Sequence, residues 1–197
     1  MKVCGITRPE DLKFVMEAGA DAFGMVIGFP RSPRNLTVEA AKRLAMEAAG
    51  GPMPITVLNG SQPRLVEEVC SVVEPHGVQL YGPGDPTLLR SMGVNLLIRP
   101  VSINTEQPLD GYDLVLLDQS HGSGRPIDLE AAARFVKTSR LPVIVSGGLG
   151  PENVAEIVRR LRPFGVDASS GVESSPGIKD GVKVKAFVSR AREAHVF

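Results

Sequence analysis

Cysteine and histidine are scarce in this 197-residue sequence, and tryptophan is absent. The two cysteines, Cys4 and Cys70, are too few for the disulfide framework of a secreted scaffold, so we expect two free thiols. The three histidines are scattered, and neither a Cys-x-x-Cys nor a His-x-x-x-His spacing occurs. The sequence therefore predicts no metal site.

An excess of charge of one sign and long apolar runs are lacking as well. The 22 basic residues balance the 22 acidic ones, which argues against a nucleic-acid-binding protein. No stretch approaches the roughly 18 to 20 uncharged apolar residues that span a bilayer, and no basic flank followed by an apolar segment marks the N-terminus. We therefore expect a soluble, cytoplasmic protein without membrane contact.

Short aliphatic runs alternate along the chain with loops rich in Gly, Pro, Ser or Asn and with longer amphipathic segments. This order is typical of βαβ units that form a parallel sheet. Eight strands are predicted: Lys2–Ile6, Ala22–Ile27, Ile55–Leu58, Gly77–Leu80, Asn95–Arg99, Leu114–Leu117, Val143–Val145 and Val166–Ser169. Because the length favours one domain with one core, we predict a single (β/α)8 barrel over residues 1–197.

The amphipathic segments predict the helices that cover such a barrel. They are Pro9–Ala18, Val38–Ala49, Arg64–Val73, Pro86–Ser91, Leu129–Thr138, Pro151–Leu161 and Val182–Ala194. Thr37 and Asp128 are expected N-caps, and Pro151 is expected to open its helix. The fifth connection, Val101–Tyr112, leaves little room for a helix, so we expect short or irregular structure there. An open doubly wound sheet is the rival fold, but no Gly-x-Gly-x-x-Gly turn follows the first strand.

Reactive side chains are expected at the carboxyl ends of the strands, where barrel enzymes place their active sites. Asp118 follows the apolar run Leu114–Leu117, so it could cap the next loop or deliver a proton to a substrate. Cys4 lies in the first strand, and by position alone it is more typical of a small buried hydrophobe than of a catalyst. Cys70 lies on the apolar face of a helix and is interpreted as core. The Gly-rich loop Gln119–Arg125 could act as a lid.

Two turns after the last two strands indicate a phosphate site. Gly147 and Gly148 follow the seventh strand, and Ser169, Ser170 and Gly171 follow the eighth. Barrels often bind a substrate phosphate at this pair of loops, where glycine lets the backbone approach the phosphate oxygens. Tight turns would also demand small residues, but two such turns on neighbouring strands favour phosphate binding.

A proline-stiffened loop after the second strand presents Arg34. A guanidinium held at the mouth of the barrel is suited to binding a carboxylate.

Taken together, these segments resemble phosphoribosylanthranilate isomerase nearly from end to end. The resemblance depends on Lys2-Val3-Cys4-Gly5-Ile6-Thr7, Gly19-Ala20-Asp21-Ala22, Ser32-Pro33-Arg34, Gly77-Val78-Gln79-Leu80, Leu116-Leu117-Asp118, Ser146-Gly147-Gly148-Leu149, Pro151-Glu152-Asn153-Val154, Val166-Asp167-Ala168-Ser169-Ser170-Gly171-Val172-Glu173 and Pro176-Gly177-Ile178-Lys179-Asp180. Each motif is weak alone, but their order and spacing are specific to this family.

The resemblance implies an Amadori rearrangement of N-(5-phosphoribosyl)anthranilate in the biosynthesis of tryptophan. It implies Asp118 as the acid that protonates the ribose ring oxygen and Cys4 as the base that takes the C2′ proton. Because a base must be ionised, the site is expected to favour the Cys4 thiolate. No metal or organic cofactor is implied, since the protonated imine is itself the electron sink.

The resemblance also assigns the groups that hold the substrate. Arg34 is expected to face the anthranilate carboxylate, Gln79 and Asp167 to contact substrate, and the two glycine turns to bind the phosphate. The sequence departs from the family at Tyr81, where a histidine is common, at Val57-Leu58-Asn59 in the third strand, and at His121, where glycine is common. These departures leave the acid, the base and the phosphate turns in place.

Two other functions remain open. One is the related sugar-phosphate isomerase of histidine biosynthesis, or a bifunctional enzyme of both pathways, but those use a carboxylate where this chain has Cys4. The other is a non-catalytic barrel that binds a phosphorylated ligand, which would not need both Cys4 and Asp118. The sequence is compatible with a monomer or a homodimer.

Overall fold

The computed structural model describes residues 1–103, 108–118 and 128–195, and in it eight parallel strands close into a barrel. The ring runs β1-β9-β8-β7-β6-β5-β4-β2, and the pairing of β1 with β2 closes it. These strands are β1 (Lys2–Cys4), β2 (Ala22–Ile27), β4 (Met53–Asn59), β5 (Gly77–Tyr81), β6 (Leu96–Val101), β7 (Leu114–Asp118), β8 (Val143–Ser146) and β9 (Gly165–Ala168). The predicted (β/α)8 barrel is confirmed.

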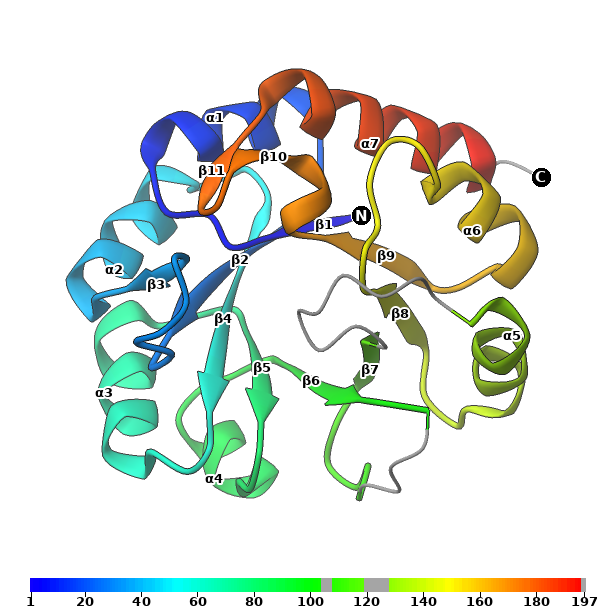
Figure 1. The fold of residues 1–197 in the computed structure, drawn as a ribbon. Coiled ribbons are helices and arrows are strands. Elements are labelled where there is room, and N and C mark those ends of the chain that lie inside the picture. The colour runs from blue at the N-terminus through cyan, green and yellow to red at the C-terminus, as the bar shows by residue number, and fades with distance from the viewer. Residues whose placement is uncertain (104–107, 119–127, 196–197) are drawn as a thin grey trace.

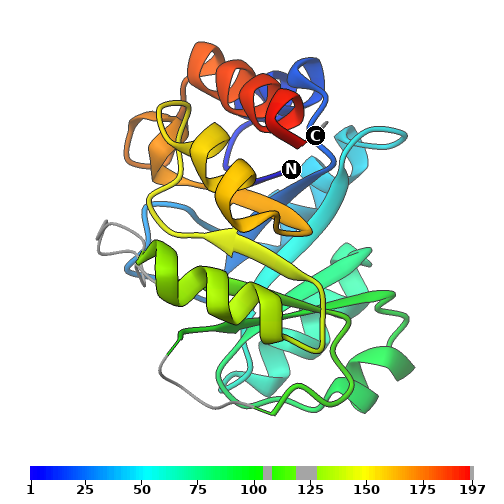
Figure 2. The same cartoon turned by 90° about the vertical axis from the view of Figure 1, so that its right-hand side faces the viewer.

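Seven helices in the described part of the chain surround this ring (Figure 1). They are α1 (Pro9–Ala18), α2 (Val38–Glu47), α3 (Pro63–Val73), α4 (Pro86–Ser91), α5 (Leu129–Thr138), α6 (Val154–Leu161) and α7 (Gly181–His195). Figure 2 shows α5, α6 and α7 side by side over the outer face, in agreement with the contacts between neighbouring helices. None of the helices in these described ranges is both long and apolar enough to cross a membrane.

Strand periodicity divides the core into a layer inside the barrel and a layer beneath the helices. On β7, Leu114 and Leu116 belong to the interior cluster, whereas Val115 and Leu117 belong to the larger cluster that includes the helices. Because successive side chains on a strand point to opposite faces, Asp118 follows Leu116 into the interior. On β1, Val3 packs in the outer cluster, so Lys2 and Cys4 face the interior.

The observed boundaries differ from the predicted ones mainly at the mouth of the barrel. β1 ends at Cys4 instead of Ile6 because Gly5 leaves the strand with φ +77°. The caps of α2 and α5 are as predicted, with Thr37 and Asp128 accepting backbone N–H groups. The predicted helix start at Pro151 is wrong, since α6 begins at Val154.

Several short strands and a short 3₁₀ helix were not predicted from the sequence. A two-residue strand, β3 (Asn35–Leu36), extends the sheet beside β2, and β10 (Glu173–Ser175) pairs with β11 (Ile178–Lys179) after the short 3₁₀ helix η1 (Ser170–Val172). In the fifth connection, residues 104–107 lie outside the described part of the chain, and the described remainder contains no helix, as expected.

Candidate active site

Cys4 and Asp118 end β1 and β7, so both lie at the carboxyl end of the barrel and face its interior. The two strands are three positions apart in the ring of eight, which places the thiol and the carboxyl group on different sides of the mouth. The loop predicted as a lid, residues 119–125 with His121, lies outside the described residues. The pair therefore meets the first requirement of the predicted acid and base, since both side chains face the interior at the same end of the barrel.

Cys4 is enclosed by its neighbours and is only 8% exposed. A Cβ atom on Gly24 of β2 would lie 2.6 Å from the Cys4 sulfur, so the absence of a side chain at Gly24 makes space for the thiol. Burial raises the pKa of Cys4, and the positive charges of Lys2 and Lys179 act in the opposite direction. The expectation that the site favours the thiolate is therefore wrong, because desolvation disfavours the charged form by more than the two lysines favour it.

Beneath Cys4, a buried ion pair crosses from β1 to β9. The Lys2 ammonium donates to Asp167 Oδ1 at 2.9 Å, and Ser146 Oγ donates to Asp167 Oδ2 at 3.2 Å. Burial opposes the charge on Lys2, but Asp167 and Cys4 outweigh it, and the pKa of Lys2 is raised. Both carboxylate oxygens of Asp167 thus accept bonds from protein groups, and its predicted contact with substrate stays a prediction.

Arg34 lies at the mouth, in a cluster with two residues that follow β9. Its guanidinium forms a two-point ion pair with Glu173, with Nε–Oε1 at 2.7 Å and Nη2–Oε2 at 2.6 Å. Lys179 donates to the same carboxylate at 2.7 Å and to the Ser169 carbonyl oxygen at 3.1 Å. A Cβ atom on Gly5 would lie 2.4 Å from Arg34 Cδ, so Arg34 lies directly over the end of β1.

The two predicted phosphate turns are in contact with each other. A Cβ atom on Gly171 would lie 2.1 Å from the Leu149 carbonyl oxygen, so only glycine permits this approach. Gly147 and Gly148 adopt φ values of +102° and +65°, a backbone conformation that glycine reaches without steric cost because it has no Cβ. The structure therefore brings together all five predicted phosphate-binding residues, because Ser169, Ser170 and Gly171 follow the neighbouring strand β9.

Asn153 explains why α6 starts later than predicted. Its side-chain oxygen accepts the Gly150 N–H at 2.9 Å, and its amide nitrogen donates to the Gly148 carbonyl oxygen at 3.0 Å. Pro151–Asn153 form a turn instead of helix, and this turn fixes the loop that contains the glycines.

Gln79 and Tyr81 face the interior from β5. Gln79 Nε2 donates to the Tyr81 hydroxyl oxygen at 3.3 Å, and the Tyr81 ring packs edge-on against Phe29 with centroids 5.9 Å apart. Burial raises the pKa of Tyr81, and the charges of Asp118, Cys4 and Asp167 raise it further, so the phenol keeps its proton. Gln79 Oε1 is buried without a hydrogen-bond partner among the described residues, which is a costly state for a polar atom.

Four residues of this region had no predicted role, although they belong to the motifs quoted above: Lys2, Asn153, Glu173 and Lys179. A signal was available for Lys2, since a lysine two positions before Cys4 on a barrel strand shares its inward face and needs a buried partner. No local pattern points to Glu173, which lies 139 positions from Arg34. In the described ranges, no group of three His, Cys, Asp or Glu side chains could hold a metal ion.

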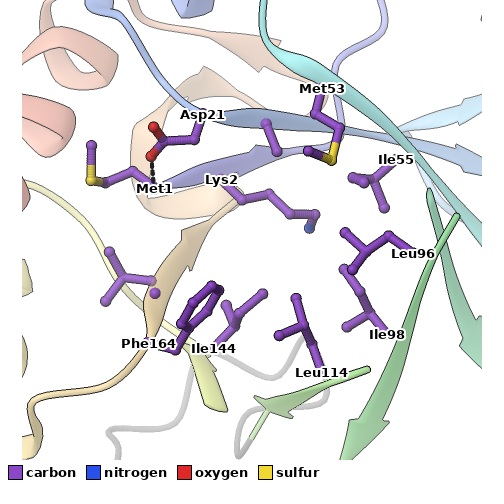
Figure 3. A pocket seen from close by; sticks show the side chains of 13 residues that line it. Met1, Lys2, Asp21, Met53, Ile55, Leu96, Ile98, Leu114, Ile144 and Phe164 are labelled. Atoms are coloured by element: carbon purple, nitrogen blue, oxygen red, sulfur yellow. Dashed lines mark hydrogen bonds and ion pairs between the residues drawn. The ribbon is translucent and has the colours of Figure 1, made fainter. Parts of the chain in front are cut away.

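The opposite, N-terminal end of the barrel has a different character. A cavity of about 370 Å³ lies there, and apolar side chains that include Met53, Leu96, Leu114 and Phe164 line it (Figure 3). The Lys2 side chain reaches into this interior, and its ammonium is withdrawn from solvent by Asp167. The polar groups expected of a sugar-phosphate site therefore lie at the mouth formed by the carboxyl ends of the strands.

Comparisons with known proteins identify the family of the chain. The family model described as N-(5′-phosphoribosyl)anthranilate (PRA) isomerase matches residues 1–190. An N-(5′-phosphoribosyl)anthranilate isomerase from Methanoregula boonei is 40% identical over 194 residues, which cover 98% of this chain and 97% of the relative.

Two solved structures are also similar. The crystal structure of a phosphoribosyl anthranilate isomerase in complex with reduced 1-(o-carboxyphenylamino)-1-deoxyribulose 5-phosphate superposes with a TM-score of 0.80 at 34% identity, over 98% of this chain and 97% of that one. Monomers generated from the dimeric isomerase of Thermotoga maritima give a TM-score of 0.80 at 33% identity, over 98% and 97% of the two chains. Because the family model matches nearly the whole chain and the relative is 40% identical over 98% of it, the chain belongs to the N-(5′-phosphoribosyl)anthranilate isomerase family.

Proposed function

We propose that this protein catalyses the Amadori rearrangement of N-(5-phosphoribosyl)anthranilate to 1-(2-carboxyphenylamino)-1-deoxyribulose 5-phosphate in tryptophan biosynthesis. The observation that supports this most strongly is the placement of Cys4 and Asp118 at the same end of the barrel, beside the paired glycine turns. A thiol and a carboxyl group that face the interior at one end of the barrel supply the base and the acid that the reaction needs.

Asp118 starts the reaction as the general acid. Its proton passes to the ribose ring oxygen, the bond between C1′ and that oxygen breaks, and the anthranilate nitrogen forms a protonated imine with C1′. The positive imine then attracts the electrons of the C2′–H bond. Asp118 is left as a carboxylate, which can accept a proton in a later step.

Cys4 continues the reaction as the general base. Its thiolate takes the C2′ proton, the electrons of that bond form a C1′–C2′ double bond, and the imine electrons return to nitrogen. The resulting amino-enol becomes the ketone when its C2′ hydroxyl loses a proton and C1′ gains one. No electron leaves the substrate, so the chain's own acid and base suffice.

The remaining site residues are proposed to hold the substrate between these two groups. Gly147, Gly148, Ser169, Ser170 and Gly171 bind the phosphate through the two touching turns. Fixing the phosphate at this side of the mouth places the ribose between β1 and β7, which lowers the entropy cost of the reaction.

At the other end of the substrate, Arg34 binds the anthranilate carboxylate. Glu173 holds its guanidinium through Nε and Nη2, so Nη1 remains available to a ligand. Gln79 Oε1, buried without a partner among the described residues, accepts a substrate hydroxyl.

Tyr81 donates its hydroxyl hydrogen to the substrate. Because Gln79 already donates to the Tyr81 oxygen, the phenol hydrogen is left for a ligand. Asp167 is proposed to contact substrate as well, because each of its carboxylate oxygens accepts one bond, from Lys2 or from Ser146, and can accept another.

We further propose that residues 1–197 act as one catalytic domain in the cytoplasm. The dimeric relative from Thermotoga maritima supports a homodimer as well as a monomer for this chain.

Complementation of a strain that lacks this isomerase tests the function. We expect growth without tryptophan from the unmodified chain, and no growth or strongly impaired growth from Cys4→Ser and Asp118→Asn. Full growth supported by Asp118→Asn would exclude the carboxyl group as the acid.

The related histidine-pathway isomerase is tested on its own substrate. Turnover of the aminoimidazole carboxamide ribonucleotide substrate, measured beside phosphoribosylanthranilate with the purified chain, is expected to be far slower. Equal turnover of the two would contradict a function limited to tryptophan biosynthesis.

A further inference from the structure

We propose that Lys2 is a positioning residue for Cys4: held by Asp167 inside the barrel, its ammonium stabilises the thiolate that removes the substrate's C2′ proton. This inference rests on the proposed function, in which Cys4 is the base. Burial disfavours ionisation of the Cys4 thiol, so a nearby positive charge is needed to stabilise the thiolate.

The geometry of β1 brings the two groups together. Lys2 and Cys4 are two residues apart on one strand, so both side chains face the barrel interior. The Lys2 ammonium is fixed by Asp167 Oδ1 at 2.9 Å, and Asp167 is fixed in turn by Ser146 at 3.2 Å. These bonds leave the ammonium little freedom, and its positive charge favours the Cys4 thiolate.

The surroundings of Lys2 indicate a role beyond packing. Apart from its partner Asp167, the interior side chains near Lys2 are apolar, among them Ile55, Leu96 and Ile144 (Figure 3). A buried ion pair is often no more stabilising than apolar residues of similar size, because both charges lose their hydration. A lysine in this layer is therefore better explained by what it does to the reactive group above it than by stability.

The electrostatic environment of Cys4 has an excess of positive groups. The groups that act on it come from five elements or loops: Lys2 (β1), Arg34 (the loop before β3), Tyr81 (β5), Asp167 (β9) and Lys179 (β11). Burial and Asp167 disfavour the thiolate, whereas Lys2 favours it more than Lys179 does. Arg34 and Lys179 share Glu173 as a counter-ion, which reduces their effect, so Lys2 is the main group that offsets burial.

Lys2 does not exchange a proton in this account. When the thiolate takes the C2′ proton, the negative charge beside Lys2 disappears, and it returns when Cys4 gives the proton up. The pKa of Lys2 is raised by Asp167 and Cys4 against the effect of burial, so the ammonium keeps its charge through both steps.

The rate at which iodoacetamide alkylates Cys4 as a function of pH tests the proposal, since only the thiolate reacts. The full-length chain is treated between pH 6 and 11, and mass spectrometry follows the peptides of Cys4 and Cys70 separately. Cys70 is an internal control, because burial raises its pKa to about 11 and Lys2 is not among the groups that act on it. Three variants are compared: Lys2→Met, the double variant Lys2→Met with Asp167→Asn, and Lys13→Met, which makes the same change at an exposed lysine.

We expect the inflection of the Cys4 profile to rise by about one pH unit or more in Lys2→Met, which is about a tenfold slower reaction below the inflection. The double variant is expected to shift in the same direction by less, because the opposing charge of Asp167 is removed as well. Circular dichroism shows whether each variant is folded. If Lys2→Met fails to fold around the unpaired Asp167, the double variant decides the question.

A folded double variant whose Cys4 profile matches the unmodified chain would overturn the proposal, as would an equal shift in Lys13→Met. The isomerase assay gives a second readout, in which the pH profile of kcat should move with the Cys4 inflection while KM stays nearly constant. Absence of turnover by the unmodified chain, together with the expected shift in alkylation, would contradict the proposed function and leave the coupling of Lys2 to Cys4 intact. Turnover by the unmodified chain without a shift in the alkylation profile of the Lys2 variants would contradict the coupling of Lys2 to Cys4 and leave the proposed function intact.

Discussion

The two ends of this barrel are built from the same eight strands and differ in almost every side chain they present. At the carboxyl end, the interior holds Cys4, Tyr81 and Asp118, and glycine turns close over β8 and β9. At the amino end, Leu96 and Leu114 surround an apolar cavity of about 370 Å³. The carboxyl ends of β1, β5 and β7 therefore hold candidate reactive groups, whereas the apolar amino end contributes to stability.

β7 shows this division within five residues. Leu114 and Asp118 lie at its two ends, and both face the interior. The strand between them, which is buried throughout, fixes the carboxyl group without requiring any loop to be ordered. Variants at the two ends should therefore separate stability from activity.

Leu114→Ala should give the largest change in stability. Removing the buried side chain should lower the free energy of unfolding by about 2–4 kcal/mol, because the truncation enlarges the cavity that Leu114 already lines. The value of kcat/KM, measured well below the melting temperature, should stay within twofold of the unmodified chain. Urea unfolding and steady-state kinetics check both, and a large loss of kcat/KM in the folded variant would contradict the separation of the two ends.

Glycine substitutions at the start of β9 and in the turn after its end separate the two ends of the barrel further. In Gly171→Ala, the new Cβ would lie 2.1 Å from the Leu149 carbonyl oxygen, so the two phosphate turns must move apart. We expect the free energy of substrate binding to weaken by about 1–3 kcal/mol in Gly171→Ala, which is measured mainly as a raised KM. In Gly165→Ala at the amino end, the Cβ meets only Ile144 at 3.6 Å, and KM should not change. Equal KM values for the two variants would count against a phosphate site.

The two tyrosines offer a matched pair for the substrate contacts. Tyr81→Phe keeps the ring against Phe29 and removes only the hydroxyl, so kcat/KM should fall about 3- to 10-fold, as expected for one neutral hydrogen bond. Tyr112→Phe makes the same change at a buried residue whose hydroxyl accepts from Arg99 at 3.3 Å outside the site. The control should lose some stability and keep its kcat/KM. A similar fall in both variants would argue against a direct role of Tyr81.

The smallest effect is expected for the pH dependence of stability. Burial alone would raise the pKa of Glu173, but Arg34 and Lys179 outweigh it, so the pKa is lowered. A lowered pKa stabilises the fold above the ordinary range of the carboxyl group, and this contribution is lost as the pH falls through the lowered value. Between pH 7 and pH 3 the free energy of unfolding of Glu173→Gln should therefore decline less steeply than that of the unmodified chain. Parallel curves would show that this carboxylate is not held by the two cations.

The sequence could predict the barrel because its strands and helices have local signals. The run Ala22–Ile27 and the helix Leu129–Thr138, which starts after the cap Asp128, have the predicted boundaries. The start of α6 could not be predicted in the same way. Asn153 there bonds to Gly148 and Gly150 instead of extending the helix, and nothing in the local pattern of Pro151 and Glu152 distinguishes the two arrangements.

The site was predictable only where a residue had a local signal. The strand-end rule found Asp118, but Cys4 gained its role only from the resemblance to a family, since its position alone favoured a buried hydrophobe. The ion pairs around these residues join Lys2 to Asp167 across 165 positions and Arg34 to Glu173 across 139. Such pairs depend on which strands become neighbours when the barrel closes, and no spacing within one sequence records that. The raised pKa of Cys4 also follows from burial in three dimensions.

Acid catalysis by Asp118 is tested by the turnover of N-(5-phosphoribosyl)anthranilate by the purified chain and by Asp118→Asn, because the substitution removes the acidic proton and keeps the size of the side chain. We predict measurable turnover by the unmodified chain and a fall in kcat of about 10²- to 10⁴-fold in the variant, with no change in melting temperature large enough to unfold it at the assay temperature. An Asp118→Asn protein that turns over substrate at the rate of the unmodified chain would contradict acid and base catalysis at this end of the barrel.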